Sequence, residues 1–158
     1  VAGDKDVISF LRFNLRSQIY AKSLPMAMTI GAIKRLEMMK NHPELRERLW
    51  EIANALQKGF REAGFDLGKT ESPVTPVFFN GELAQTTHLI KDLRKNYGIF
   101  CSVVIYPVVP KGVIMLRIIP TAAHTMEDVN YTIQAFKEVK KKLETNAYPT
   151  NEMADFRN

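Results

Sequence analysis

The sequence predicts an α+β domain, in which helices cover one face of a small, mainly antiparallel sheet. Apolar residues recur at three- and four-residue spacings in residues 4–16, 23–40, 43–63, 83–97 and 125–143, which is typical of amphipathic helices. Runs rich in β-branched residues occur at 74–79, 99–106 and 113–119 and predict strands. Helices followed by a β-α-β-β-α order favour a two-layer architecture.

The N-terminal half is expected to be helical, with its boundaries set by capping residues and prolines. Asp4 can cap a first helix, and Ser23 before Leu24-Pro25 indicates the start of a second. Pro43 disfavours a helical residue before it and opens a further helix, which Gly64 is placed to end. The expected divisions are a leading helix and connector at 1–22, a long broken helix at 23–64, a β-α-β-β-α layer at 65–144 and a polar tail at 145–158.

Local signals also mark the second half of the chain. Pro76 lies in the first predicted strand and suggests a sheet edge or a bulge. Gly98 is placed to end the helix at 83–97. Thr125 and Asp128 have the spacing of a capping box, which predicts the start of the last helix.

Composition excludes several classes of protein. The chain has 158 residues, of which 46% are hydrophobic, and no apolar run is long enough to span a bilayer. The single Cys101 allows no internal disulfide and no cysteine-based zinc site, and it fits a reducing cytoplasm. The three histidines lack metal-ligand spacing, so no metal site is expected. The net charge of +5 is interleaved with glutamates along helices, which disfavours nucleic-acid binding.

Arg117 is the residue that most suggests a binding function. The strand around it, Val113 to Ile119, is otherwise apolar. A guanidinium cannot be buried there unpaired, because desolvating an isolated charge is costly. Arg117 therefore needs a carboxylate partner, a route to solvent, or an anionic ligand held by its two-pronged donor group. The residues alone favour a structural salt bridge over an anionic ligand.

The segments on either side of Arg117 are further candidates. Pro107-Val108-Val109-Pro110-Lys111-Gly112 forms a stiff loop before the strand, and His124-Thr125 follows it. We expect the loop, Arg117 and His124-Thr125 to share one end of the sheet. A rigid hairpin and a helix cap are the plain alternatives. Cys101 alternates with apolar neighbours and is expected to be a buried small residue.

These stretches, in this order, resemble the C-terminal signature of the α-oxoamine synthases. The resemblance rests on Pro107 to Gly112, Leu116-Arg117 and Thr121 to Thr125. Val1 to Ile8 and Ile19-Tyr20-Ala21-Lys22-Ser23-Leu24-Pro25 resemble two further family segments. The match extends from Val1 to about Leu143. It implies the C-terminal domain of the aspartate-aminotransferase-like, pyridoxal-phosphate-dependent fold.

The resemblance also implies an activity and roles for individual residues. Enzymes of this family condense an amino acid such as glycine, alanine or serine with an acyl-CoA to give an α-oxoamine, and they act as homodimers. Their cofactor is pyridoxal 5'-phosphate, and the lysine that forms its Schiff base is expected upstream of Val1, so no catalytic residue is expected in this chain. Arg117 matches the arginine that binds the substrate carboxylate. Ala21, Lys22 and Ser23 match a stretch near the cofactor phosphate of the partner subunit.

Two departures from the family pattern leave the substrates open. Met115 stands where several relatives have an additional arginine, and Ile105-Tyr106 stands where some have another. Two other functional interpretations of the sequence are possible. One is a freestanding ligand-binding or regulatory α+β module in which Arg117 holds a small anion. The other is part of an aminotransferase-type enzyme.

Overall fold

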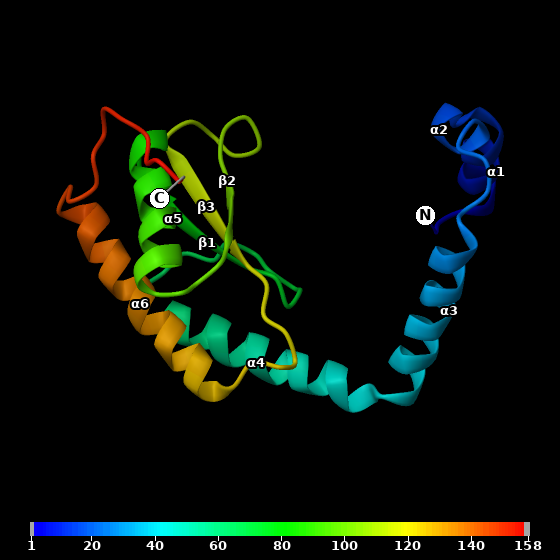
Figure 1. Cartoon of the computed structure of the whole chain (residues 1–158), viewed down its shortest axis with the longest axis horizontal. Helices are drawn as coiled ribbons and strands as arrows, with labels where there is room; N and C mark the ends of the chain where they lie inside the picture. Colours follow the sequence, from blue (N-terminus) through cyan, green and yellow to red (C-terminus); the bar gives the residue numbers. More distant parts are fainter. Residues whose placement is uncertain (1, 157–158) are drawn as a thin grey trace. The chain divides into compact units, whose positions relative to one another are not determined.

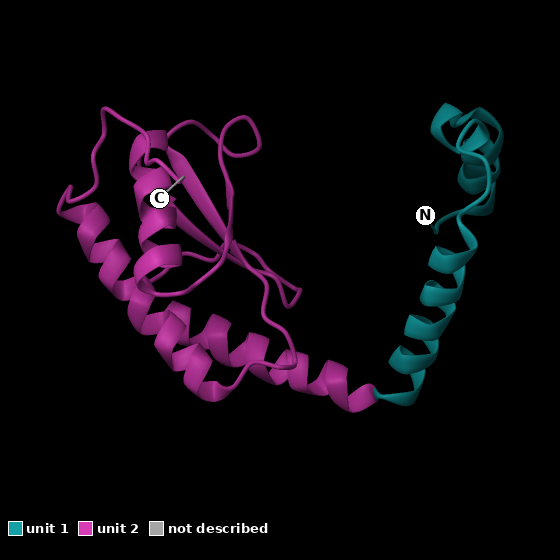
Figure 2. Cartoon of the chain, in the orientation of Figure 1, with its two compact units in different colours: residues 1–42 teal, residues 43–158 magenta. Residues whose placement is uncertain are grey.

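The structure is a computed structural model that describes residues 2–156. Val1, which begins the first stretch of the resemblance, and residues 157–158, which end the expected polar tail, lie outside the described residues. The chain forms two compact units, residues 1–42 and 43–158 (Figure 2).

The first unit consists of helices without a buried core. It contains α1 (Lys5–Asn14), α2 (Arg16–Ile19) and α3 (Met26–Asn41), and none of their described residues is buried. Asp4 caps α1 as expected, because its carboxylate accepts a hydrogen bond from the Asp6 N–H at 2.9 Å. The expected cap at Ser23 is wrong. The N-cap of α3 is Pro25, whose fixed φ suits a helix entrance, and it makes no side-chain cap.

The second unit is built on a three-stranded antiparallel sheet in the order β1-β3-β2. The strands are β1 (Thr75–Asn80), β2 (Ser102–Val104) and β3 (Val113–Ile118). Pro76 lies in β1, an edge strand, as its lack of a donor N–H predicts. The strand expected at 99–106 is only three residues long, because β2 pairs with β3 only from Ser102 to Val104 before the chain leaves the sheet.

Three helices pack against this sheet and against each other (Figure 1). They are α4 (Pro43–Glu62), α5 (Leu83–Asn96) and α6 (Met126–Glu144). Helix α4 begins at Pro43, and Gly64 follows its end with a φ of 74°. The Thr125–Asp128 capping box starts α6 as the spacing predicts. The α+β fold class is therefore confirmed.

The core lies between the three helices and one face of the sheet. Alternate residues of the strands point into it, among them Val77 of β1 and Leu116 of β3, both fully buried. Phe136 of α6 is also fully buried, and its ring meets that of Phe60 edge-to-face at a centroid distance of 5.1 Å. Cys101 is buried as expected, and burial raises the pKa of its thiol to about 11.

The segment after α6 takes part in the core, although its composition is polar. Tyr148 is buried, and its hydroxyl donates a hydrogen bond to the Asp92 carboxylate of α5 at 2.7 Å. Lys142 and Asn96 donate to the same carboxylate at 2.7 and 2.6 Å. Burial by itself would raise the pKa of Asp92, but these three hydrogen bonds outweigh it and the pKa is lowered. Tyr148 thus ties the segment after α6 to α5.

Among the described residues there is no helix of the length and hydrophobicity that a membrane crossing requires. Residues 2–156 also contain no group of three or more histidine, cysteine, aspartate or glutamate side chains able to hold a metal ion.

Truncating the centre of the core should destabilise the second unit strongly. Phe136→Ala removes a fully buried ring that packs against Phe60, and we expect the free energy of unfolding to fall by about 3–5 kcal/mol. Lys137→Ala, at the neighbouring exposed position of α6, is the control and should change it by less than about 0.5 kcal/mol. Urea unfolding followed by circular dichroism measures both; equal effects would contradict this account of the core.

Asp92 should make stability depend on pH in the acid range. Its native pKa lies below the ordinary value of 3.8, so the unfolded chain binds the proton more tightly. The ionised Asp92 carboxylate therefore contributes its full stabilisation of the fold above the ordinary pKa of 3.8. This contribution is lost as the pH falls through the lower native pKa. We expect Asp92→Asn to reduce this acid-dependent loss, measured by urea unfolding between about pH 6 and pH 2.5. An identical pH profile in the two proteins would refute the assignment.

Candidate functional site

Arg117 is exposed, and it lies on the face of the sheet that points away from the core. In β3 the side chains of Leu116 and Ile118 are buried in the core, so the pleat directs Arg117 to the opposite face. We call this surface the open face and define it by residues 76, 78, 102, 104, 115 and 117. The salt bridge favoured by the sequence is not formed, since the structure describes no ion pair for Arg117 within residues 2–156. Its charge is instead solvated.

One side chain holds the guanidinium of Arg117. Its Nε–H donates a hydrogen bond to Oγ of Ser102 at 3.1 Å, and Ser102 lies directly opposite Arg117 in the β2–β3 register. The Ser102 hydroxyl in turn makes a long contact of 3.5 Å with the Arg117 carbonyl oxygen. Within residues 2–156 no protein acceptor is described for the two terminal nitrogens of Arg117. Its two-pronged donor group is therefore free to bind a carboxylate.

The proline loop at residues 107–112 lies at the other end of β3. Val113 begins the strand directly after the loop, and Arg117 comes four residues later, which is about 13 Å along a strand. Gly112 has a φ of 80° and its carbonyl accepts the N–H of Gly81 at 3.0 Å. Lys111 Nζ lies 5.3 Å from the centre of the Tyr106 ring. The loop is thus a well-defined turn, and the expectation that it shares one end of the sheet with Arg117 is wrong.

The three candidate phosphate residues, Ala21, Lys22 and Ser23, lie in the first unit. They form the exposed connection between α2 and α3, and Lys22 has a φ of 59°. Ser23 precedes α3 but does not cap it, so its hydroxyl is not used at the N-terminus of that helix. Backbone N–H groups, a hydroxyl and an ammonium are donors suited to a phosphate dianion.

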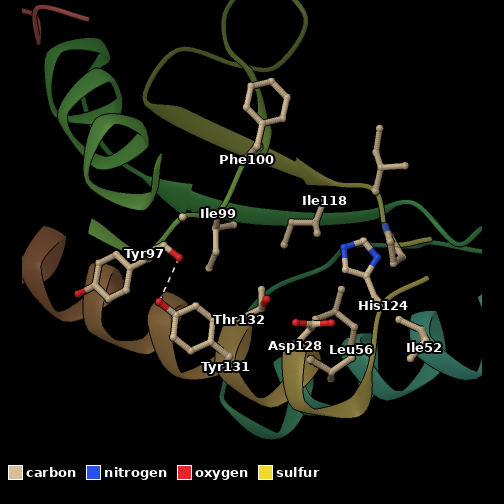
Figure 3. A pocket seen from close by; sticks show the side chains of 14 residues that line it. Ile52, Leu56, Tyr97, Ile99, Phe100, Ile118, His124, Asp128, Tyr131 and Thr132 are labelled. Atoms are coloured by element: carbon tan, nitrogen blue, oxygen red, sulfur yellow. Dashed lines mark hydrogen bonds between the residues drawn. The ribbon is translucent and has the colours of Figure 1, made fainter. Parts of the chain in front are cut away.

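A cavity of about 450 Å³ lies on the core side of the sheet (Figure 3). Its apolar lining includes Ile52 and Leu56 of α4, and Ile118 of β3. Because Ile118 and Arg117 are adjacent in β3, their side chains point to opposite faces, and Arg117 does not line the cavity. The cavity and the guanidinium of Arg117 therefore lie on different faces of the sheet.

His124, Asp128 and Tyr131 line this cavity, and each uses a polar group in local structure. His124 Nδ1 accepts the Thr121 N–H at 2.9 Å, while the Asp128 carboxylate accepts the Thr125 N–H at 2.8 Å. The hydrogen bond from the Thr125 backbone is the main reason that the pKa of Asp128 is lowered. Tyr131 donates to the Tyr97 carbonyl at 3.0 Å, the dashed line in Figure 3. His124-Thr125 is thus a helix cap, the plainer of the two interpretations.

The structure brings together Arg117 and one residue that the sequence analysis did not single out. Ser102 is a polar residue in a run otherwise apolar from Ile99 to Ile105. That contrast is a usable signal, but only the β2–β3 register shows which side chain it faces.

Comparison with protein families matches the model described as aminotransferase class I and II to residues 1–136. Among curated proteins, cysteate-C-fatty acyltransferase from Capnocytophaga ochracea is 51% identical, and the alignment covers 98% of this chain and 38% of that protein. Serine palmitoyltransferase from Sphingobacterium spiritivorum is 34% identical over 91% of this chain and 36% of its own length. An 8-amino-7-oxononanoate synthase from Petrotoga mobilis is 33% identical over 92% of this chain and 36% of its own length.

Solved structures show the same fold. A serine palmitoyltransferase from S. paucimobilis, with bound PLP–myriocin aldimine, matches with a TM-score of 0.73 at 24% identity, over 92% of this chain and 36% of that one. An 8-amino-7-oxononanoate synthase from Francisella tularensis matches with a TM-score of 0.69 at 20% identity, over 92% of this chain and 41% of that one.

The chain spans somewhat more than a third of the length of these curated relatives, and the family model matches most of it. The curated relatives named above are all α-oxoamine synthases. The chain belongs to the aminotransferase class I and II family, with α-oxoamine synthases as its relatives.

Proposed function

We propose that this chain is part of a pyridoxal-phosphate-dependent acyltransferase that condenses an amino acid with an acyl-CoA to give an α-oxoamine. The role of this chain is to bind the carboxylate of the amino acid through Arg117 and to contribute contacts to a homodimer. The proposal is carried by the exposed guanidinium of Arg117, whose terminal nitrogens have no described protein partner within residues 2–156. A bidentate pair with a carboxylate would fix the orientation of the substrate.

The cofactor would be held partly by this chain. When bound, pyridoxal 5'-phosphate supplies an electron sink for the bonds at the substrate Cα. Ala21, Lys22 and Ser23 present the donors that would hold its phosphate on the partner subunit. The lysine that binds the cofactor covalently would lie outside this chain, since no lysine here stands in the sequence context of that group.

The relatives and the open face support a choice of substrates to test. The 51% identity to a cysteate-C-fatty acyltransferase makes cysteate and a fatty acyl-CoA the first pair to test, followed by serine, glycine and alanine. Met115 and Val104 lie beside Arg117 on the open face, half-buried and apolar. The proline loop at 107–112 would border the substrate site from the other end of β3. These neighbours would contact the uncharged parts of the substrates.

Residues 1–144 would form the C-terminal domain of the enzyme, with residues 145–158 appended to it. A cytoplasmic location is supported by the single, buried and unpaired Cys101.

Removing the guanidinium should weaken use of the amino acid. In the whole enzyme, Arg117→Ala is expected to lower kcat/KM for the amino acid at least about 30-fold, because a charge-assisted bidentate pair is lost. KM for the acyl-CoA should change little. The matched control is Arg61→Ala, an exposed arginine at the end of α4. Steady-state kinetics with release of CoA as the signal tests this, and an unchanged amino-acid dependence would contradict the carboxylate role.

The chain by itself should not hold the cofactor covalently. After incubation of residues 1–158 with pyridoxal 5'-phosphate and treatment with borohydride, we expect no stoichiometric label on any one lysine, because none matches the cofactor lysine of the family. Peptide mass spectrometry locates any label, with the whole enzyme as the positive control. Specific trapping at one lysine of this chain would overturn the assignment.

A further inference from the structure

Arg117 has almost no polar neighbours on the open face. Across β1 it faces Pro76, whose ring offers no hydrogen-bonding group, and across β2 it faces Ser102. The next pairs along the sheet, Phe78–Met115 and Val104–Met115, are apolar. Among the described residues opposite or next to Arg117 on this face, Ser102 alone can accept a hydrogen bond from the guanidinium.

The hydrogen bond between Ser102 and Arg117 uses only one edge of the guanidinium. It engages the Nε–H at 3.1 Å and leaves both terminal nitrogens available. Because the guanidinium is planar, fixing Nε on a residue of the sheet also fixes the plane in which the other donors lie. Because Nε–H is the donor in this hydrogen bond, the Ser102 oxygen presents a lone pair to the arginine. The hydroxyl proton of Ser102 is left for another acceptor, and the Arg117 carbonyl oxygen lies 3.5 Å from Oγ.

We propose that Ser102 is a positioning residue that orients the guanidinium of Arg117 for bidentate binding of the substrate carboxylate. This inference rests on the proposed function and identifies the group that gives Arg117 its geometry. A free arginine side chain loses considerable rotamer entropy when it binds a ligand, whereas one already held at Nε loses less. Ser102 therefore strengthens amino-acid binding without touching the substrate.

The position of Ser102 in the fold suits this role. Ser102 is half-buried on the three-residue edge strand β2, directly opposite Arg117 of the central strand. Paired Cβ atoms in an antiparallel sheet are about 5 Å apart, so a short hydroxyl side chain reaches Nε while the terminal nitrogens extend beyond it. A longer amide at residue 102 would compete for those terminal nitrogens.

The test is Ser102→Ala in the whole enzyme. We expect KM for the amino acid to rise about five- to tenfold, because a hydrogen bond to a charged group is lost, with KM for the acyl-CoA unchanged. Ser102→Thr keeps a hydroxyl on a β-branched residue that suits a strand. Its KM for the amino acid should therefore be close to that of the wild type. Val103→Ala, at the next position of β2, controls for disturbance of the edge strand and should leave the kinetics unchanged. A Ser102→Ala enzyme with normal KM for the amino acid would overturn the inference.

A double-mutant cycle separates this inference from the proposed function. If Ser102 acts through Arg117, Ser102→Ala should have no further effect on amino-acid KM in an Arg117→Ala background. The inhibition constant of the amine that lacks the substrate carboxylate should be equal in wild type and Ser102→Ala. Additive effects in the cycle, or weakened binding of that amine, would refute positioning by Ser102. A normal amino-acid dependence in Arg117→Ala alone would instead refute the proposed function.

Discussion

The alternation of side chains along β3 is the constraint on which the fold and the candidate site both depend. β3 is the central strand, so it pairs with β1 on one side and β2 on the other. Leu116 and Ile118 enter the core, which leaves Arg117 between them on the open face. A slip of one residue would bury the guanidinium and expose two large apolar side chains, so core packing also specifies where the charge lies.

The helical layer holds β3 in this register. Phe136 and Phe60 pack edge-to-face behind the sheet, and α6 is secured at both ends. Its start is closed by the Thr125 capping box, and its last turn is joined to α5 through Lys142 and the Asp92 carboxylate. Because the helices occupy the core side, a ligand for Arg117 has to approach from the open face.

The structure also separates two sites that the sequence places close together. His124-Thr125 and the cavity beside them lie on the core side, while Arg117 points the other way. The proline loop lies at the opposite end of β3 and is a turn in its own right. What remains around Arg117 is Ser102 and an apolar surface, a simple environment in which one hydroxyl controls one guanidinium.

Short-range rules account for what could be predicted from the amino acids alone. Proline geometry placed the start of α4 at Pro43 and the edge strand at Pro76, while side-chain capping placed Asp4 and Thr125 at helix starts. Other short motifs, chiefly Pro107 to Gly112, Leu116-Arg117 and Thr121 to Thr125, were enough to identify the family. The Ser102–Arg117 pair, the burial of Tyr148 and the exposure of Arg117 were decided by the folded chain. Each depends on contacts between residues far apart in the sequence, which helix propensity and turn chemistry do not encode.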